Sequence, residues 1–196
     1  MGDNRDEADE WPAIGDDAPD SGPVALPDAR ELALLVSNVT GPMCGKTFAP
    51  ADDRARGQSI CGRMFLLPIQ GKRDINIILS SDKAGSEALG AAMFGRPPQQ
   101  LTRGMVDDAI AELLNMVAGQ VQKHLKIDQP LGLPRSITLA DLATAGGVGF
   151  SDSLLLTSSG IGDMKLWIYE RTQDEKTAAA PGGGFVRSLF RKLTSH

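Results

Sequence analysis

The chain has 196 residues, a hydrophobic fraction of 41% and a formal net charge of −5, which predicts one globular domain with room for terminal tails. The acidic first residues do not have the pattern of a secretory signal, and no apolar run approaches the ~18 residues of a membrane span, so we expect a cytoplasmic protein. Two cysteines and two histidines are too few for a disulfide framework or a His/Cys metal site. The sequence lacks a basic stripe with interleaved aromatic residues, so nucleic-acid binding is not expected.

The acidic charge is concentrated at the N-terminal end. Residues 1–28 hold nine acidic residues and one basic residue, a balance of −8, so the rest of the chain carries +3 of the net −5. This stretch is rich in Asp, Gly and Pro, which predicts a disordered acidic tail over residues 1–27. A short docking motif at Trp11 and Ile14 is the less common alternative.

The first helix is predicted to begin after Asp28. Glu31 follows three residues later, which is the pattern of a capping box. We expect the helix to run to about Val39 and to be ended by Gly41 and Pro42.

A β-hairpin and a second helix are predicted next. Residues 58–69 and 75–80 both show the two-residue alternation that is typical of β-strands, and a polar turn lies between them. Ser81 or Asp82 then has the character of an N-cap, and Gly95 that of a C-cap. The second helix is therefore expected to run to about Phe94.

The strongest helix prediction covers residues 107–125. At about 100° per residue, Asp108, Glu112, Asn115 and Gly119 lie on the side opposite an apolar stripe. Asn and Gly are poor helix-interior residues, each costing roughly 0.5 to 1 kcal/mol against Ala, so this face favours close approach by another molecule. The buried stripe is expected to consist of Val106, Ile110, Leu113, Leu114, Val117, Val121 and Leu125.

More strands are predicted after this helix. Helices combined with runs of antiparallel strands are typical of the α+β class, so we expect an antiparallel or mixed sheet packed against two or three helices, with residues 28–171 as the domain. The expected pieces are a strand over 135–140, strand material at 146–150 and 153–157, a hairpin turn at 158–163 and a final strand at 164–169.

The C-terminal residues form two further segments. Residues 172–184 end in three glycines and predict a flexible linker. Residues 185–196 place apolar residues on one helical side and add Arg187, Arg191 and Lys192. About ten residues are too few for a stable isolated helix, so a partner-docking or membrane-surface helix and a frayed tail stand as equal alternatives.

The pattern with chemical potential is Glu112-x-x-Asn115. Neither side chain is a good nucleophile, but a carboxamide accepts and donates hydrogen bonds and can hold a water in one orientation. Such positioning matters most in phosphoryl transfer, and a carboxylate can pair with a partner's lysine. Judged only by their positions in the helix, Glu112 and Asn115 are more commonly explained as solvent-exposed polar residues without a functional role. Cys44 and Cys61 are better explained as small buried core thiols than as a redox pair.

The stretch Asp108-x3-Glu112-x2-Asn115, followed by Met116, Ala118 and Gly119, resembles the signature helix of the CheC/CheX/FliY chemotaxis phosphatases. The sequence AELLNMVAGQ is most similar to the CheX-type branch. The order of predicted helices and strands over 28–171 also fits this family. The resemblance implies a CheC/CheX-like fold and a bacterial phosphatase that hydrolyses the phospho-aspartate of a CheY-type response regulator receiver domain.

The resemblance also implies residue roles. Asn115 would orient the hydrolytic water, Glu112 would pair with a receiver lysine, and Asp108 and Gly119 would support partner binding. The Mg²⁺ would belong to the receiver, so no cofactor is expected on this chain, and a homodimer is implied. Some relatives carry a second Glu-x-x-Asn on the first helix, but here Leu34 follows Glu31, so one site is expected. A non-catalytic CheX-like binding module or scaffold is the alternative function.

Overall fold

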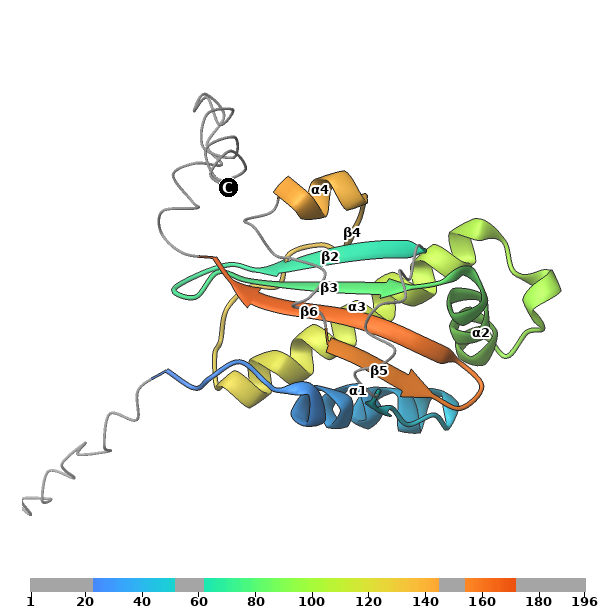
Figure 1. Cartoon of the computed structure of the whole chain (residues 1–196), viewed down its shortest axis with the longest axis horizontal. Helices are drawn as coiled ribbons and strands as arrows, with labels where there is room; N and C mark the ends of the chain where they lie inside the picture. The colour runs from blue at the N-terminus through green and yellow to red at the C-terminus, as the bar shows by residue number, and fades with distance from the viewer. Residues whose placement is uncertain (1–22, 52–61, 145–153, 172–196) are drawn as a thin grey trace, which may run out of the picture.

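The computed structural model describes residues 23–51, 62–144 and 154–171 (Figure 1). Predictions for the acidic tail up to residue 22, for residues 58–61 and 146–150, for Cys61, and for the linker and basic tail lie outside these residues. The described elements are α1 (Ala29–Cys44), β1 (Ala49–Pro50), β2 (Arg63–Ile69), β3 (Ile75–Ser81), α2 (Lys83–Phe94), the 3-10 turn η2 (Pro98–Gln100), α3 (Arg103–Leu125), β4 (Arg135–Ile137), α4 (Leu139–Thr144), β5 (Leu154–Ser158) and β6 (Gly162–Glu170).

The strands form one six-stranded sheet in the order β1-β5-β6-β3-β2-β4. Every pairing is antiparallel, including the predicted β2–β3 hairpin, in which Ile69 lies opposite Ile75. The α+β class is confirmed, and of the two predicted sheet types the antiparallel one is present.

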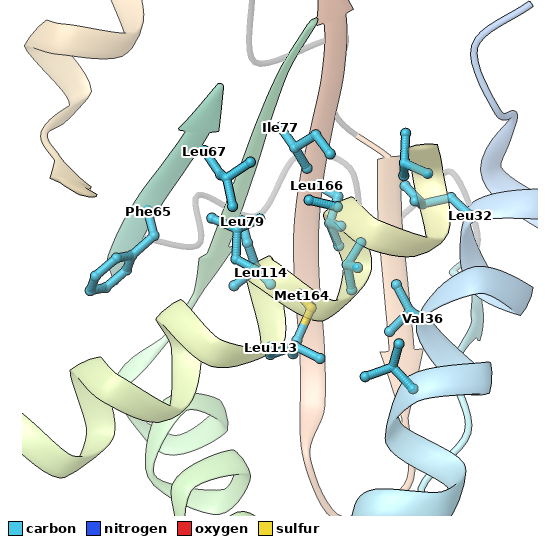
Figure 2. Close-up of a cluster of buried hydrophobic side chains, with 14 of the residues drawn as sticks. Leu32, Val36, Phe65, Leu67, Ile77, Leu79, Leu113, Leu114, Met164 and Leu166 are labelled. Atoms are coloured by element: carbon cyan, nitrogen blue, oxygen red, sulfur yellow. The ribbon is translucent and has the colours of Figure 1, made fainter. Parts of the chain in front are cut away.

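The main core lies between one face of the sheet and helices α1 and α3 (Figure 2). Leu32 and Val36 reach it from α1, and Leu113 and Leu114 reach it from α3. The sheet contributes Phe65, Leu67, Ile77, Leu79, Met164 and Leu166. The whole predicted stripe of the central helix is buried, so the rotation of α3 about its axis is set by this contact.

A second, smaller core lies on the other face of the sheet. Trp167 is only 1% exposed and packs there with Ile78, Ile137 and Leu142. Leu142 comes from α4, a short helix that was not predicted; the strand predicted over 135–140 ends at Ile137 because α4 begins at Leu139. Its start carries a capping box, because Thr138 N–H donates to Asp141 Oδ2 at 2.7 Å and Asp141 N–H donates to Thr138 Oγ1 at 3.2 Å.

The predicted end of the first helix is wrong. The Asp28–Glu31 capping box is present, with both of its hydrogen bonds at 2.9 Å, but α1 continues past Pro42 to Cys44. Proline removes only one donor in this last turn, and the turn is stabilised by packing of Met43 and Cys44 against the core. Gly45 ends the helix with φ 67°, the left-handed conformation that glycine adopts readily.

The start and end of the second helix follow the prediction. Asp82 caps α2 by accepting a hydrogen bond from Gly85 N–H at 2.7 Å, and Gly95 closes it at φ 61°. Among the described residues, none of the helices combines the length and apolar character needed to cross a bilayer.

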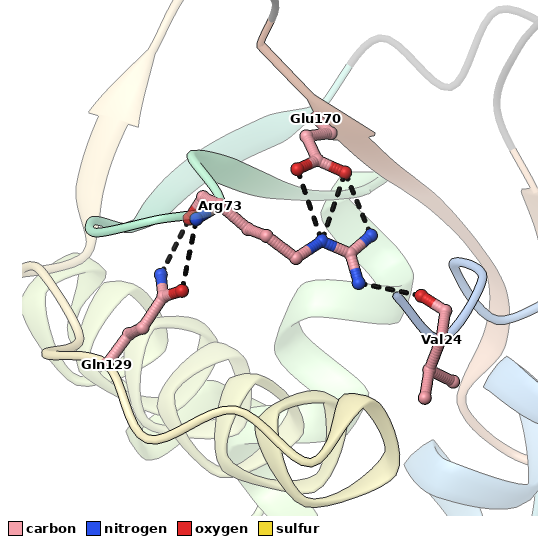
Figure 3. A network of polar contacts seen from close by, with 4 residues as sticks. All are labelled: Val24, Arg73, Gln129 and Glu170. Carbon is pink, nitrogen blue, oxygen red and sulfur yellow. Dashed lines mark hydrogen bonds and ion pairs between the residues drawn. The ribbon is translucent and has the colours of Figure 1, made fainter. Parts of the chain in front are cut away.

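A polar network joins both ends of the described domain (Figure 3). Arg73, in the turn of the β2–β3 hairpin, binds the Glu170 carboxylate at the end of β6 and the Val24 carbonyl, the latter at 2.6 Å. Gln129 donates to the Arg73 carbonyl at 2.6 Å and accepts from Arg73 N–H at 3.1 Å. The segment before α1, the end of β6 and the loop after α3 therefore meet at one corner.

Candidate functional site on helix α3

Helix α3 is a 23-residue element that crosses beneath the sheet (Figure 1). It begins four residues earlier than predicted, because Thr102 is its N-cap and accepts a hydrogen bond from Met105 N–H at 3.2 Å. Since its apolar stripe is fully occupied by the core, its opposite face points away from the sheet.

The four predicted site residues lie along this outer face. Asp108 and Glu112 are exposed, and Asn115 and Gly119 are half-buried. At 1.5 Å per residue they span about 16 Å of helix. A Cβ atom added to Gly119 would meet nothing within 4 Å, so the backbone there is open to a partner.

Three of these residues line one surface depression of about 400 Å³. Asp108, Glu112 and Asn115 contribute from α3, together with Ala109 and Ala111. Gly119 is not among the lining residues. The depression therefore joins two carboxylates and one carboxamide, and leaves the glycine beside them.

The other wall of the depression was not predicted. Met93 and Phe94 come from the end of α2, and Pro134 comes from the loop before β4. Phe94 is 42% exposed, and Leu133, next to Pro134, is 86% exposed. Phe94, an aromatic residue directly before the capping Gly95, was the sequence signal that could have identified this wall.

The two carboxylates have no cationic partner among the described residues. Neither Asp108 nor Glu112 forms an ion pair there, whereas the neighbouring Asp107 pairs with Arg63 and with Arg103. Uncompensated carboxylates at the surface attract positive charge on a partner. The depression is thus suited to a surface that offers a cation and apolar contacts.

The remaining candidates lie elsewhere. Cys44 is half-buried rather than fully buried, and its thiol donates to the Thr40 carbonyl at 3.2 Å. Burial raises the pKa of this thiol, which makes it a poor nucleophile at neutral pH. His124 lies in the last turn of α3. Within the described ranges, no three His, Cys, Asp or Glu side chains are arranged to hold a metal ion.

Comparison with protein families gives a match over residues 64–150 to the family described as chemotaxis phosphatase CheX. This match covers slightly less than half of the chain, so it is residues 64–150 that are similar to the CheX family. The matched residues include the whole of α3 and therefore Asp108, Glu112, Asn115 and Gly119. No curated protein matches the chain by sequence.

Solved structures described as CheX share the fold of this chain. CheX from Vibrio vulnificus is 18% identical with a TM-score of 0.55, and the match covers 76% of this chain and 99% of that chain. The CheX–CheY–BeF3–Mg²⁺ complex from Borrelia burgdorferi contains a chain 18% identical with a TM-score of 0.52, covering 74% and 99%. CheX from Desulfovibrio desulfuricans is 17% identical with a TM-score of 0.50, covering 71% and 96%. The predicted CheC/CheX-like fold is confirmed.

Proposed function

We propose that this chain hydrolyses the phospho-aspartate of a CheY-type receiver domain. The observation that carries the proposal is the depression on α3, where Asp108, Glu112 and Asn115 lie together on the outer face of a CheX-like domain. Hydrolysis of a phospho-aspartate agrees with the description of the matched family. It requires only side chains that lie on the outer face of α3.

In the proposed reaction, Asn115 positions the attacking water. Its carboxamide oxygen accepts a hydrogen bond from the water and its nitrogen donates one near the phosphoryl group. The water oxygen forms a bond to phosphorus while the bond from phosphorus to the aspartyl oxygen breaks. Inorganic phosphate and the free aspartate are the products, and the proton of the water leaves with the phosphate. Positioning of this kind is much of the catalysis in phosphoryl transfer.

Glu112 sets the orientation of the partner. It is exposed one helical turn before Asn115 and has no cationic partner among the described residues. A receiver lysine placed against it would fix the docking register, with Asp108 adding negative charge one turn earlier. The Mg²⁺ that neutralises the phosphoryl oxygens would belong to the receiver.

A solved complex supports this choice of partner. In the Borrelia burgdorferi structure, a CheX is bound to CheY with BeF3 and Mg²⁺. That CheX has 18% identity to this chain, so the complex supports the class of partner and leaves the particular receiver open. We also propose a cytoplasmic location and a homodimer for this chain.

The test measures phosphate release from phosphorylated receivers with wild type and Asn115→Ala side by side. We expect the substitution to reduce the rate by about 10²-fold or more, with an unchanged circular dichroism spectrum because Asn115 lies outside the core. Gln120→Ala, another half-buried polar residue of α3 that does not line the depression, is the matched control. A fully active Asn115→Ala protein would contradict the proposal.

The apolar wall of the depression also favours a second candidate, a non-catalytic binding module. Phe94 and Pro134 would bury apolar surface against a receiver whether or not hydrolysis follows. Binding of one phosphorylated receiver without faster phosphate release would assign this function instead.

A further inference from the structure

The depression on α3 combines negative charge with apolar surface. Asp108 and Glu112 supply negative charge without a described cationic partner, and Phe94, Met93 and Pro134 supply apolar surface. A ligand that satisfies both is an amphipathic segment with basic side chains.

One segment of this same chain has that composition. Residues 185–196 contain Phe185, Leu189, Phe190 and Leu193 together with Arg187, Arg191 and Lys192. The segment follows the described domain after the 13 residues 172–184.

The corner drawn in Figure 3 brings Glu170, at the end of β6, near Gln129, in the loop after α3. Arg171 N–H donates to the Asp74 carbonyl at 2.8 Å, directly after Glu170 binds Arg73. Gln129 bonds to Arg73, and the Gln122 side chain of α3 donates in turn to the Gln129 carbonyl. Residue 171 is therefore connected to α3 through a short chain of hydrogen bonds.

The part of the path that runs along α3 is shorter than the extended linker. From Gln122, Asn115 is about 10 Å and Asp108 about 21 Å along the helix, at 1.5 Å per residue. A 13-residue linker spans at most about 43 Å when extended, and a flexible one has a root-mean-square span of about 20 Å. A tethered segment at such a separation reaches a local concentration in the millimolar range.

We infer that residues 185–196 bind over the depression of their own chain. The basic side chains lie against Asp108 and Glu112, and the apolar side chains lie against Phe94 and Pro134. A segment of about ten residues does not hold a helix alone, so its order depends on this docking. If the proposed function holds, the bound segment competes with the receiver for Glu112 and Asn115.

The binding can be tested without any receiver, by zero-length carbodiimide coupling in the full chain. The reagent activates a carboxylate, the Lys192 amine attacks the activated carbonyl, an amide forms and a urea leaves. Mass spectrometry then identifies the joined residues. We expect links from Lys192 to Asp108 or Glu112, formed within one chain in a mixture of ¹⁴N- and ¹⁵N-labelled protein.

Two full-chain variants sharpen the test. Arg187→Glu with Arg191→Glu keeps the reactive Lys192 and should reduce the yield of these links at least about threefold, since like charges then face Asp108 and Glu112. Leu34→Ser changes an exposed leucine of α1 outside the depression and should leave the yield unchanged.

Three results would overturn the inference. They are coupling of Lys192 only to carboxylates of residues 1–22, coupling only between light and heavy chains, and a yield that charge reversal leaves unaltered. Because the readout needs neither phosphate release nor a receiver, its failure is distinct from failure of the proposed phosphatase activity.

Discussion

Arg73 binds Glu170 through two guanidinium nitrogens, with Nε 3.1 Å from both carboxylate oxygens and Nη2 2.8 Å from one of them. The two residues are 97 positions apart in the chain. A third nitrogen, Nη1, donates to the Val24 carbonyl, so one side chain holds both ends of the described domain.

Replacing Arg73 should therefore destabilise the domain. We expect Arg73→Met to lower the free energy of unfolding by about 1 to 3 kcal/mol, because charge-assisted hydrogen bonds of a side chain only 15% exposed are lost. Arg73→Lys should retain part of the stability, since it keeps the charge and loses the planar fork. Urea unfolding measures both. Lys83→Met, in the exposed pair with Glu87, is the control and should change stability by less than about 0.5 kcal/mol.

Gly119→Ala should separate stability from partner binding. The position is inside α3 and a Cβ there meets nothing within 4 Å, so alanine should raise the free energy of unfolding by about 0.4 to 1 kcal/mol. If a receiver approaches this backbone closely, the same variant should bind it more weakly, and Gly119→Leu more weakly still. Thermal unfolding and receiver titration give the two quantities. Equal receiver affinity for all three proteins would remove Gly119 from the partner-binding surface.

Charge reversal in the C-terminal segment should open the site to the receiver. With Arg187→Glu and Arg191→Glu, we expect KM for a phosphorylated receiver to fall about 2- to 10-fold and kcat to stay constant, because only competition for the ground-state complex is removed. Lys72→Glu with Lys83→Glu changes the net charge equally at exposed positions and serves as the control. A KM that moves equally in both double variants would indicate a general charge effect instead.

The Cys44 thiol should be slow to react at neutral pH. Burial raises its pKa, so in a Cys61→Ser background we expect alkylation to be slower than in the urea-unfolded chain and to reach half its maximal rate at a higher pH. The pKa of the Cys44 thiol is higher in the folded chain than in the unfolded chain. The contribution of this thiol to the free energy of unfolding is therefore fully present below the unfolded-state pKa, and it is lost as the pH rises through the folded-state pKa. Equal rates in the folded and unfolded chains would show that the thiol is solvent-like.

Local signals in the sequence determined much of this protein. The capping box at Asp28, the closing Gly95 and the apolar period of α3 depend on residues within one or two turns of each other, and the structure agrees with all three. The same period placed Asp108, Glu112 and Asn115 on one outward face, because residues three or four positions apart lie on the same side of a helix.

Only the tertiary structure decided which other elements meet that face. The wall built by Phe94 and Pro134 comes from the end of α2 and the loop before β4, and the Arg63–Asp107 pair joins residues 44 positions apart. Tertiary packing also stabilises α1 beyond Pro42 and buries Trp167 on the second face of the sheet. These contacts form between segments that are distant in the chain. Bringing such segments together costs conformational entropy, and burial of the whole core offsets this cost. A short stretch of sequence cannot show whether the gain exceeds the cost.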